Sequence, residues 1–510
     1  DDFNGTFESI QYCASDDNDG TNAVDLADSA ASWNLQFADY DATNPDVRLV
    51  GNSLLLMTGI GPDSDANVPT TDIAGNPRAG TLTSIGAFHK PLTDVYYSLS
   101  PYGTADIKTG SPTCGITSGV MTLNTAQTGN IGQGCKITYD TSKVVYIKTV
   151  TDSSHFVVVD KFGVTPPNIA SGTTVNSITH VWASLSAAEA GADDSGYLNT
   201  ANLVSANVVL NLACYYDHDD YTADTARCLV SGYTTSATRY VNIYTPTGGT
   251  QSLNSQRHLG KWNSEKYKIE YTSTQTYEEV FAITDNFVRV LGVQIHNTIG
   301  HASCRVFHPA PTSTTDNLIV FYNCIARGTV TENVSSSGFR PGSNTTKCIC
   351  INCIAYGFKA TSLNYGVGFF LTGATSSGNQ RFYNCIAYDC GYGFYDYSYR
   401  GGTCINCIAM ATGTNDFAGV YSLTGSNYNC SEDSTAPGTT YIRSAVVSEI
   451  FTDAANGDFS LATGSDCIDA GTDLSSDSYW PFTTDITGTT RSTWDIGAFE
   501  YVASGGGGVS

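Results

Sequence analysis

Apolar residues occur along most of this chain in short runs interrupted by Gly, Asn and Asp, without the spacing of an amphipathic helix. The stretches NVVLNLACYY (207–216) and NFVRVLGVQIHN (286–297) are typical, because β-branched and aromatic residues lie between turn-forming ones. Runs of this kind favour strands. The pattern therefore predicts an all-β protein with few and short helices.

A short motif recurs in the second half of the chain. Asn-Cys-Ile-Ala is repeated four times, a shorter Asn-Cys-Ser follows at 429–431, and the five asparagines are 29, 32, 22 and 23 residues apart. A Gly followed by Phe or Val stands between successive copies. Repeats of this length, built from short strands, predict a β-solenoid in which each repeat forms one coil. The residues that we expect to stack into a ladder are Asn323, Cys324, Asn352, Cys353, Asn384, Cys385, Asn406, Cys407, Asn429 and Cys430.

Each letter of the repeat suits a structural role. Asn tolerates the left-handed conformation of a tight corner, and Cys is small and usually buried. The spacings Cys-x-Cys-x-x-Cys at 348–353 and Cys-x-x-Cys at 404–407 resemble metal hooks. In strands, however, neighbouring side chains point to opposite faces, so we expect packed thiols rather than a zinc site. A disulfide between stacked cysteines, or between Cys385 and Cys390, stays an open alternative.

A second, longer repeat divides the chain into domains. Three segments recur in order, displaced by 412, 413 and 411 residues: DATNPDVRL (41–49) and DAANGDFSL (453–461), TDIAGNPR (71–78) and TDITGTTR (484–491), SIGAF (84–88) and DIGAF (495–499). The chain is therefore expected to begin with the end of one solenoid and to continue with a whole one. The expected domains are 1–90, a partial copy of the C-terminal module; 91–180, a small β-rich unit; 181–501, the solenoid with its closing module; and 502–510, a Gly-rich tail.

The repeated coils and the closing stretch TDITGTTRSTWDIGAFEY resemble the right-handed parallel β-helix (pectate-lyase-like) superfamily, above all the large secreted or surface β-helix proteins of bacteria and phages. The resemblance covers 181–501 and the partial copy at 1–90. It implies a right-handed parallel β-helix, and the capping-box spelling from Ser186 to Glu189 predicts a short helix that closes its N-terminal end. The superfamily contains lyases, glycosidases, tailspikes, adhesins and structural proteins, so the fold does not specify an activity.

Composition narrows the partners. The net charge is −24, only 14% of residues are charged, and no stretch of 18 apolar residues occurs. The negative electrostatic field of such a chain repels nucleic acid, and no apolar stretch is long enough to span a membrane. The Gly-, Tyr- and Thr/Ser-rich composition favours an extracellular protein, secreted or exposed on a bacterial surface or virion. No cofactor is expected. We interpret two acidic segments first as solvated turns. The alternative is that they bind calcium, with the candidate ligands Asp17, Asp19, Asp217, Asp219, Asp220 and Asp224.

One segment, YDCGYGFYDYSYRGG (388–402), carries the strongest candidate chemistry. Asp389 and Asp396, with Arg400, are the candidate catalytic groups of a glycosidase or lyase, which needs paired carboxylates. Five tyrosines there offer flat surfaces for sugar rings: Tyr388, Tyr392, Tyr395, Tyr397 and Tyr399. The isolated His258 is expected to be structural.

We therefore expect a structural or adhesive β-helix protein that associates with itself, either head to tail into a fibre, filament or surface layer or as a trimer. The repeat that begins in mid-unit motivates the head-to-tail alternative, since a contact that does not close generates a filament. The alternative function is a carbohydrate-binding or polysaccharide-depolymerising tailspike-like protein. An enzyme, if it is one, would be a polysaccharide lyase or a glycoside hydrolase.

Overall fold

The structure is a computed structural model. It describes residues 92–503 apart from eight short gaps: 217–221, 314–315, 331–334, 343–345, 360–365, 372–379, 397–401 and 420–424. Before residue 92 it describes only the short strands β1 (Ala14–Ser15), β2 (Val24–Asp25), β3 (Phe37–Asp39), β4 (Asp46–Leu49), β5 (Gly59–Ile60) and β6 (Leu82–Thr83).

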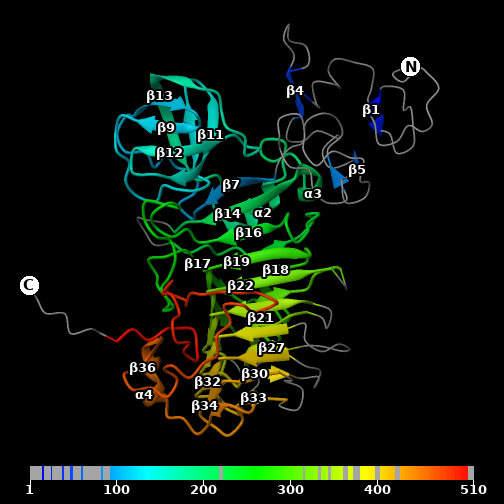
Figure 1. Ribbon diagram of the computed structural model, residues 1–510, viewed down its shortest axis with the longest axis vertical. Coiled ribbons are helices and arrows are strands. Elements are labelled where there is room, and N and C mark those ends of the chain that lie inside the picture. The colour runs from blue at the N-terminus through cyan, green and yellow to red at the C-terminus, as the bar shows by residue number, and fades with distance from the viewer. Residues whose placement is uncertain are drawn as a thin grey trace, which may run out of the picture.

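Three long parallel sheets form a solenoid-like stack, to which successive coils contribute one strand per sheet (Figure 1). Sheet 1 contains, in spatial order, β31 (Gly402–Ile405), β28 (Gln380–Tyr383), β25 (Cys348–Ile351), β22 (Leu318–Tyr322), β19 (Phe287–Leu291), β16 (Val241–Tyr244), β14 (Val208–Cys214) and β7 (Thr93–Leu99). Sheet 2 contains β17 (Lys268–Thr272), β20 (Gln294–Ile299), β23 (Ile325–Val330), β26 (Ile354–Tyr356), β29 (Ile386–Tyr388), β32 (Ile408–Met410), β34 (Asn429–Ser431) and β35 (Tyr441–Ile442). Sheet 3 contains β15 (Cys228–Val230), β18 (Glu279–Ile283), β21 (Cys304–Pro309), β24 (Ser336–Phe339), β27 (Val367–Leu371), β30 (Tyr392–Asp396) and β33 (Asn415–Ala418). The expected all-β, solenoid-like class is confirmed.

A closed antiparallel barrel lies at the N-terminal end of the stack (Figure 1). Its strands are β8 (Thr113–Thr117), β9 (Val120–Leu123), β10 (Lys136–Tyr139), β11 (Lys143–Val150), β12 (His155–Val159) and β13 (Ile169–Thr179). We expected 91–180 to form one unit, but β7 pairs along its whole length with β14 of sheet 1. The chain therefore enters the solenoid before it forms the barrel and returns afterwards.

A short helix covers the first coils, as expected. Helix α2 (Leu185–Gly191) places Leu185 and Ala188 in the solenoid core. Its N-cap is Ser184, whose Oγ accepts from the amide of Ala187, so the cap lies two residues before the predicted Ser186. Helix α3 (Leu203–Ala206) then leads into β14. The longest described helix has seven residues, and none of the described helices is long enough to cross a membrane.

Aromatic stacking fills the interior. Phe307, Phe339, Phe369, Phe394 and Phe417 occupy equivalent positions of sheet 3, and neighbouring rings stack with centroids 4.7–5.0 Å apart. This spacing matches the distance between parallel strands, so in-register coils superpose identical side chains.

Thiols pack beside this column of rings. All fifteen cysteines that the structure describes are buried and unbridged, and no group of three metal-binding side chains forms among the described residues. Their burial agrees with the interpretation as packed thiols.

The asparagines form the corner between sheets 1 and 2. Asn323, Asn352, Asn384 and Asn406 all have φ between 50° and 57°, the left-handed region that Asn tolerates. Asn352 Nδ2 donates to Asn323 Oδ1 at 3.0 Å, and Asn406 Nδ2 donates to Asn384 Oδ1 at 3.1 Å.

The fifth copy differs from the other four. Tyr428, rather than Asn429, takes the left-handed corner, and Cys430 pairs with Ile408 instead of Cys407. Cys430 therefore packs outside the interior, under the C-terminal module. Asn429 and Cys430 are displaced by one residue from the ladder in which the sequence placed them.

The C-terminal module, residues 443–501, lies along the lower coils (Figure 1). It contains α4 (Val447–Ile450), β36 (Phe451–Asp453), the 3₁₀ turn η2 (Ala454–Asn456) and β37 (Asp458–Leu461). Its apolar residues cover the outer faces of sheets 2 and 1. The hairpin β3–β4 has the same antiparallel pairing as β36–β37, and each pairs an N-terminal Phe with a C-terminal Leu. This agrees with the sequence repeat, although the assignment of 1–90 as a module stays a prediction.

The module binds the asparagine corners directly. Asn384 Nδ2 donates to the carbonyls of Asp495 (2.9 Å) and Gly497 (2.8 Å). Arg491, which is buried and paired with Glu500 at 3.2 Å, donates through Nη2 to Asn352 Oδ1 at 3.0 Å. The closing motif thus forms a strap across the ladder.

We predict that Asn384→Ala loosens this strap. Two carbonyls lose their donor, so the free energy of unfolding should fall by about 2 kcal/mol more than in a corner variant without these bonds. Asn323→Ala is the matched control, because Asn323 has the same left-handed corner but its side chain bonds Asn352 rather than the module. Limited proteolysis within 443–501 should accelerate only in Asn384→Ala. Equal proteolysis of both variants would contradict the role of the strap.

Candidate functional site

The structure describes only some of the residues that the sequence proposed for a site. Tyr397, Tyr399 and Arg400 lie outside the described residues, as do Asp17, Asp19, Asp217, Asp219 and Asp220. Asp224, the remaining calcium candidate, is buried. Its carboxylate accepts hydrogen bonds from the amides of Leu185 and Ala226 and from the Tyr267 hydroxyl. These bonds attach α2 to the first coil, which gives Asp224 a structural role.

The candidate catalytic carboxylates Asp389 and Asp396 lie before the start and at the end of β30. Asp389 lies in the turn before β30 with φ 50°, whereas Asp396 is the last residue of β30 and is buried. The five residues of β30 span on the order of 13 Å, which exceeds the separation of about 5–9.5 Å that glycosidases use. This separation does not support a glycosidase spacing, and the assignment of Asp389, Asp396 and Arg400 as catalytic groups stays a prediction.

The described tyrosines separate onto two faces. Tyr388 lies on sheet 2 and packs against Phe451 and Phe459 of the C-terminal module, so it is part of an internal contact. Tyr392 and Tyr395 lie on the outer face of sheet 3, and their rings stack 4.4 Å apart with an interplanar angle of 12°. Only this second pair is placed for a ligand.

A strip of cationic and aromatic side chains runs along the outer face of sheet 3, which we call the sheet 3 strip: Arg305, His308, Arg340, Phe370, Tyr395 and Tyr392. Four of its members directly follow the stacked interior phenylalanines in the sequence. Because each Phe points inward and the next residue points outward, stacking the coils aligns these outer side chains as well.

The upper end of the strip is a charged cluster. Arg305 Nη1 donates to Glu279 Oε1 at 2.7 Å and to His308 Nε2 at 3.0 Å. His308 Nδ1 lies 2.6 Å from the carbonyl of Arg340 and donates to it. Burial and the charge of Arg305 lower the pKa of His308, so the imidazole is neutral and accepts through Nε2. The cluster therefore has one carboxylate and one paired guanidinium.

Arg340 forms no salt bridge with any residue that the structure describes, although the Glu279 carboxylate acts on it electrostatically. Its guanidinium lies 4.4 Å from the centre of the Phe370 ring, and among the described residues it makes no hydrogen bond. Burial and the neighbouring Arg305 lower its pKa to about 10, which still leaves it protonated at neutral pH. Phe370 in turn meets the edge of Tyr395 at 5.5 Å. The strip therefore joins a cation without a salt-bridge partner among the described residues to the neighbouring rings of Phe370 and Tyr395.

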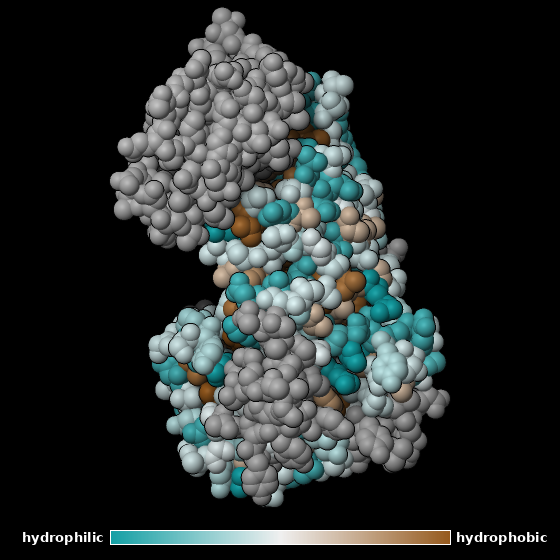
Figure 2. Space-filling view, turned by 90° about the vertical axis from the view of Figure 1, so that its right-hand side faces the viewer, coloured by the Kyte–Doolittle hydropathy of each residue, from teal (hydrophilic) through white to brown (hydrophobic). Residues whose placement is uncertain are grey.

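Among the described residues, the apolar clusters under the barrel and under the C-terminal module contain no residue of sheet 3. The apolar cluster under the barrel takes its solenoid residues from sheet 1, and the two clusters under the C-terminal module take theirs from sheets 1 and 2. Figure 2 views the side of the solenoid on the right of Figure 1, where hydrophobic residues form only small, separate patches.

Two other buried groups are structural. His258 is 1% exposed, burial lowers its pKa to about 3, and Nδ1 accepts from the amide of Gly260, as expected for a structural histidine.

Asp416 and Asp433, which the sequence did not single out, each accept the other's backbone amide, at 3.0 and 3.1 Å. They close the last coils. Burial and the charge of Asp433 raise the pKa of Asp416 to about 7.

We predict a pH dependence from this pair. A folded-state pKa of about 7 against an unfolded value of 3.8 means that the native state holds the proton more tightly. The stability contributed by protonated Asp416 is complete below about pH 4 and is lost as the pH rises to about 7. Denaturant titrations should show that Asp416→Asn flattens this fall in unfolding free energy.

Asp473→Asn is the control for this measurement. The exposed carboxylate of Asp473 accepts from the amide of Ser475, which lowers its pKa, so it titrates below the same pH window. The slope between pH 4 and 7 should be unchanged in this variant. A slope for Asp416→Asn as steep as that of the unmodified protein would refute the assignment.

No protein-family model matches the chain, and comparisons with curated proteins and with solved structures returned no match either. The candidate site is therefore defined by the geometry of this chain alone.

Proposed function

We propose that the protein is a structural and adhesive right-handed parallel β-helix, displayed outside the cell, whose sheet 3 strip binds an extended acidic polysaccharide. The observation that carries this proposal is the guanidinium of Arg340, which has no salt-bridge partner among the described residues, beside the Phe370 and Tyr395 rings on the outer face of sheet 3. Aromatic faces bind sugar rings, and a guanidinium binds carboxylate or sulfate groups through paired N–H donors.

The shape of the strip favours a polymer. From β21 to β30 it crosses four coils, about 14 Å at the spacing of parallel strands, along the axis of the stack. Its side chains are held by a packed interior and do not need to be ordered on binding, which favours affinity. The net charge of −24 opposes non-specific attraction of anions, so a local cationic site would confer selectivity.

The sheet 3 strip is proposed to bind the polysaccharide without cleaving it. Asp389 and Asp396 are separated by the length of β30, and the carboxylate of the strip, Glu279, is paired with Arg305. An extracellular location is supported by the composition, and the burial of the described thiols would shield them from oxidants there.

Head-to-tail self-association is the structural part of the proposal. Its support is the displaced sequence repeat and the common pairing of β3–β4 and β36–β37. Electron microscopy of the purified chain should show end-to-end fibres. Monomers at all concentrations, or closed trimers, would refute head-to-tail assembly without affecting the binding strip.

We predict that Arg340→Gln weakens binding to polygalacturonate, alginate or hyaluronan at least tenfold, the loss of one charge-assisted contact of about 1.4 kcal/mol. Tyr395→Ala should weaken it similarly. Titration calorimetry at two salt concentrations measures both, with dextran as the neutral polymer. Arg327→Gln is the matched control. Arg327 lies on sheet 2, away from the sheet 3 strip, and its guanidinium is also close to an aromatic ring, that of Trp262, at 5.6 Å.

The control variant should bind as the unmodified protein does. Absence of binding to all three acidic polymers, or equal affinity of Arg340→Gln and the unmodified protein, would refute the proposed function.

A further inference from the structure

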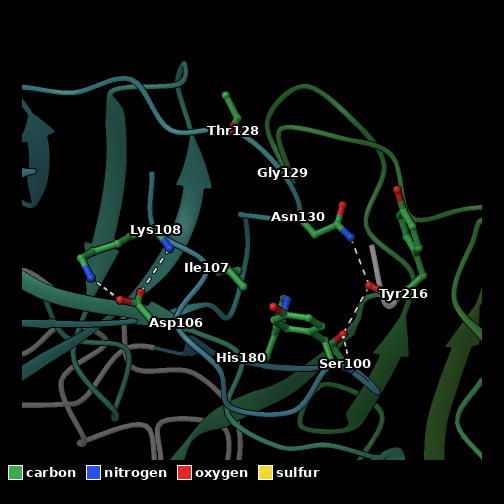
Figure 3. Close-up of a pocket in the computed structure, with 10 residues that line it drawn as sticks. Ser100, Asp106, Ile107, Lys108, Thr128, Gly129, Asn130, His180 and Tyr216 are labelled. Atoms are coloured by element: carbon green, nitrogen blue, oxygen red, sulfur yellow. Dashed lines mark hydrogen bonds and ion pairs between the residues drawn. The ribbon is translucent and has the colours of Figure 1, made fainter. Parts of the chain in front are cut away.

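A cavity of about 310 Å³ lies where the barrel meets the first coils of the solenoid. Its walls come from the segment after β7, a barrel loop and the ends of β13 and β14 (Figure 3). The lining residues include Tyr102, Thr128, Asn130, His180 and Tyr216. Because several of these segments are distant in sequence, the cavity exists only when the barrel is docked.

His180 provides a polar group at the base of the cavity. The side chain is 2% exposed, its ring packs 4.6 Å from that of Tyr215, and Nδ1 lies 3.1 Å from Ser98 Oγ and 3.7 Å from Cys135 Sγ. Nε2 makes no hydrogen bond among the described residues and is the ring atom left for the cavity. Burial lowers the pKa of His180 to about 3, so the imidazole is neutral at physiological pH.

The remaining polar groups are held in place. Asn130 Nδ2 donates to the carbonyl of Tyr216 at 3.1 Å, while Asn130 Oδ1 accepts from Gln256 Nε2 at 3.1 Å. Ser100 Oγ donates to the same Tyr216 carbonyl and accepts from the amide of Tyr102. A ligand would therefore meet fixed donors and acceptors, which lowers the entropic cost of binding.

The cavity has no net charge. Asp106 and Lys108 on its wall form an ion pair with each other, as Figure 3 shows, and Asp106 also accepts from the amide of Ile178. The neutral His180 adds none. Neither a phosphate nor a carboxylate would find an unpaired cation among the described lining residues, so a neutral ligand with many hydroxyl groups fits best. Tyr102, which is 38% exposed, offers an aromatic face beside the cavity.

We propose that this junction cavity binds a single neutral sugar residue, with His180, Asn130 and Ser100 contacting its hydroxyls and Tyr102 its apolar face. The volume is at the lower end of the range for small-molecule pockets, about 300–1,000 Å³, which suits one ring and excludes an internal stretch of a polymer. The site is independent of the sheet 3 strip, because it uses different elements and takes a neutral rather than an acidic ligand.

The test is ligand-observed NMR and calorimetry of the whole chain with a panel of neutral monosaccharides: glucose, galactose, mannose, rhamnose and N-acetylglucosamine. At least one should bind and raise the unfolding temperature, since a ligand held only by the docked barrel stabilises the folded state. Absence of binding by every sugar at about 10 mM, roughly ten times a Kd of about 1 mM, would overturn the proposal.

Two variants assign the site. Tyr102→Ala should weaken the binding at least tenfold, and Thr128→Trp, at an exposed position on the rim, should abolish it by filling the cavity without altering the core. Tyr441→Ala is the matched control, because Tyr441 is 43% exposed on the opposite end of the solenoid. Undiminished affinity in Thr128→Trp would overturn the proposal.

Each of the two binding sites can be refuted without refuting the other. Thr128→Trp should retain full affinity for acidic polysaccharides, and Arg340→Gln should retain full affinity for the monosaccharide. Loss of monosaccharide binding in Arg340→Gln would place the sugar on the sheet 3 strip and overturn the assignment to the cavity.

Discussion

The register of the coils is the constraint on which the rest of the structure depends. Up to β33, the strands of the three sheets pair in parallel with their equivalents in the next coil, so a side chain at one position has equivalent neighbours above and below. The left-handed asparagine corners maintain this register, because an amide in that corner reaches its counterpart on the adjacent coil. A slip of one residue would exchange the interior phenylalanines for the outer side chains of the sheet 3 strip.

The corners serve a second purpose in the docking of the C-terminal module. The Asn–Asn bond is absent between Asn352 and Asn384, and there the module supplies its own partners, the guanidinium of Arg491 and the carbonyl of Gly497. Asp485 accepts from the amides of Thr487, Thr489 and Glu500 and so shapes the same segment. The residues of the closing motif thus fold the strap and attach it to the asparagine ladder.

The parts of the fold that depend on local pattern could be predicted from the sequence. The repeated Asn-Cys and Gly-Phe pairs correctly indicated stacked coils, although a turn at the Gly-Phe pairs was wrong, because Gly338, Gly368 and Gly393 lie within strands of sheet 3. Asn429 was misplaced by one residue because the corner there falls on Tyr428, which no local signal distinguishes. The pairing of β7 with β14 was missed because these strands are joined only after more than a hundred residues, and no periodicity connects them.

The candidate site was harder to predict, for a physical reason. Arg305 and His308 lie on the same strand, β21, but Arg340 is 32 residues beyond His308 and shares no motif with them, so the three side chains meet only because the coils stack. One signal was present: the residue after each interior Phe must point outward, so reading that position down the repeats gives most of the strip. The excursion that forms the barrel leaves the stack at Ser100 and returns at Trp182, and these two ends are joined by a 3.0 Å hydrogen bond. The coils therefore continue in register past the barrel, which is an insertion whose two ends meet at one point of the stack.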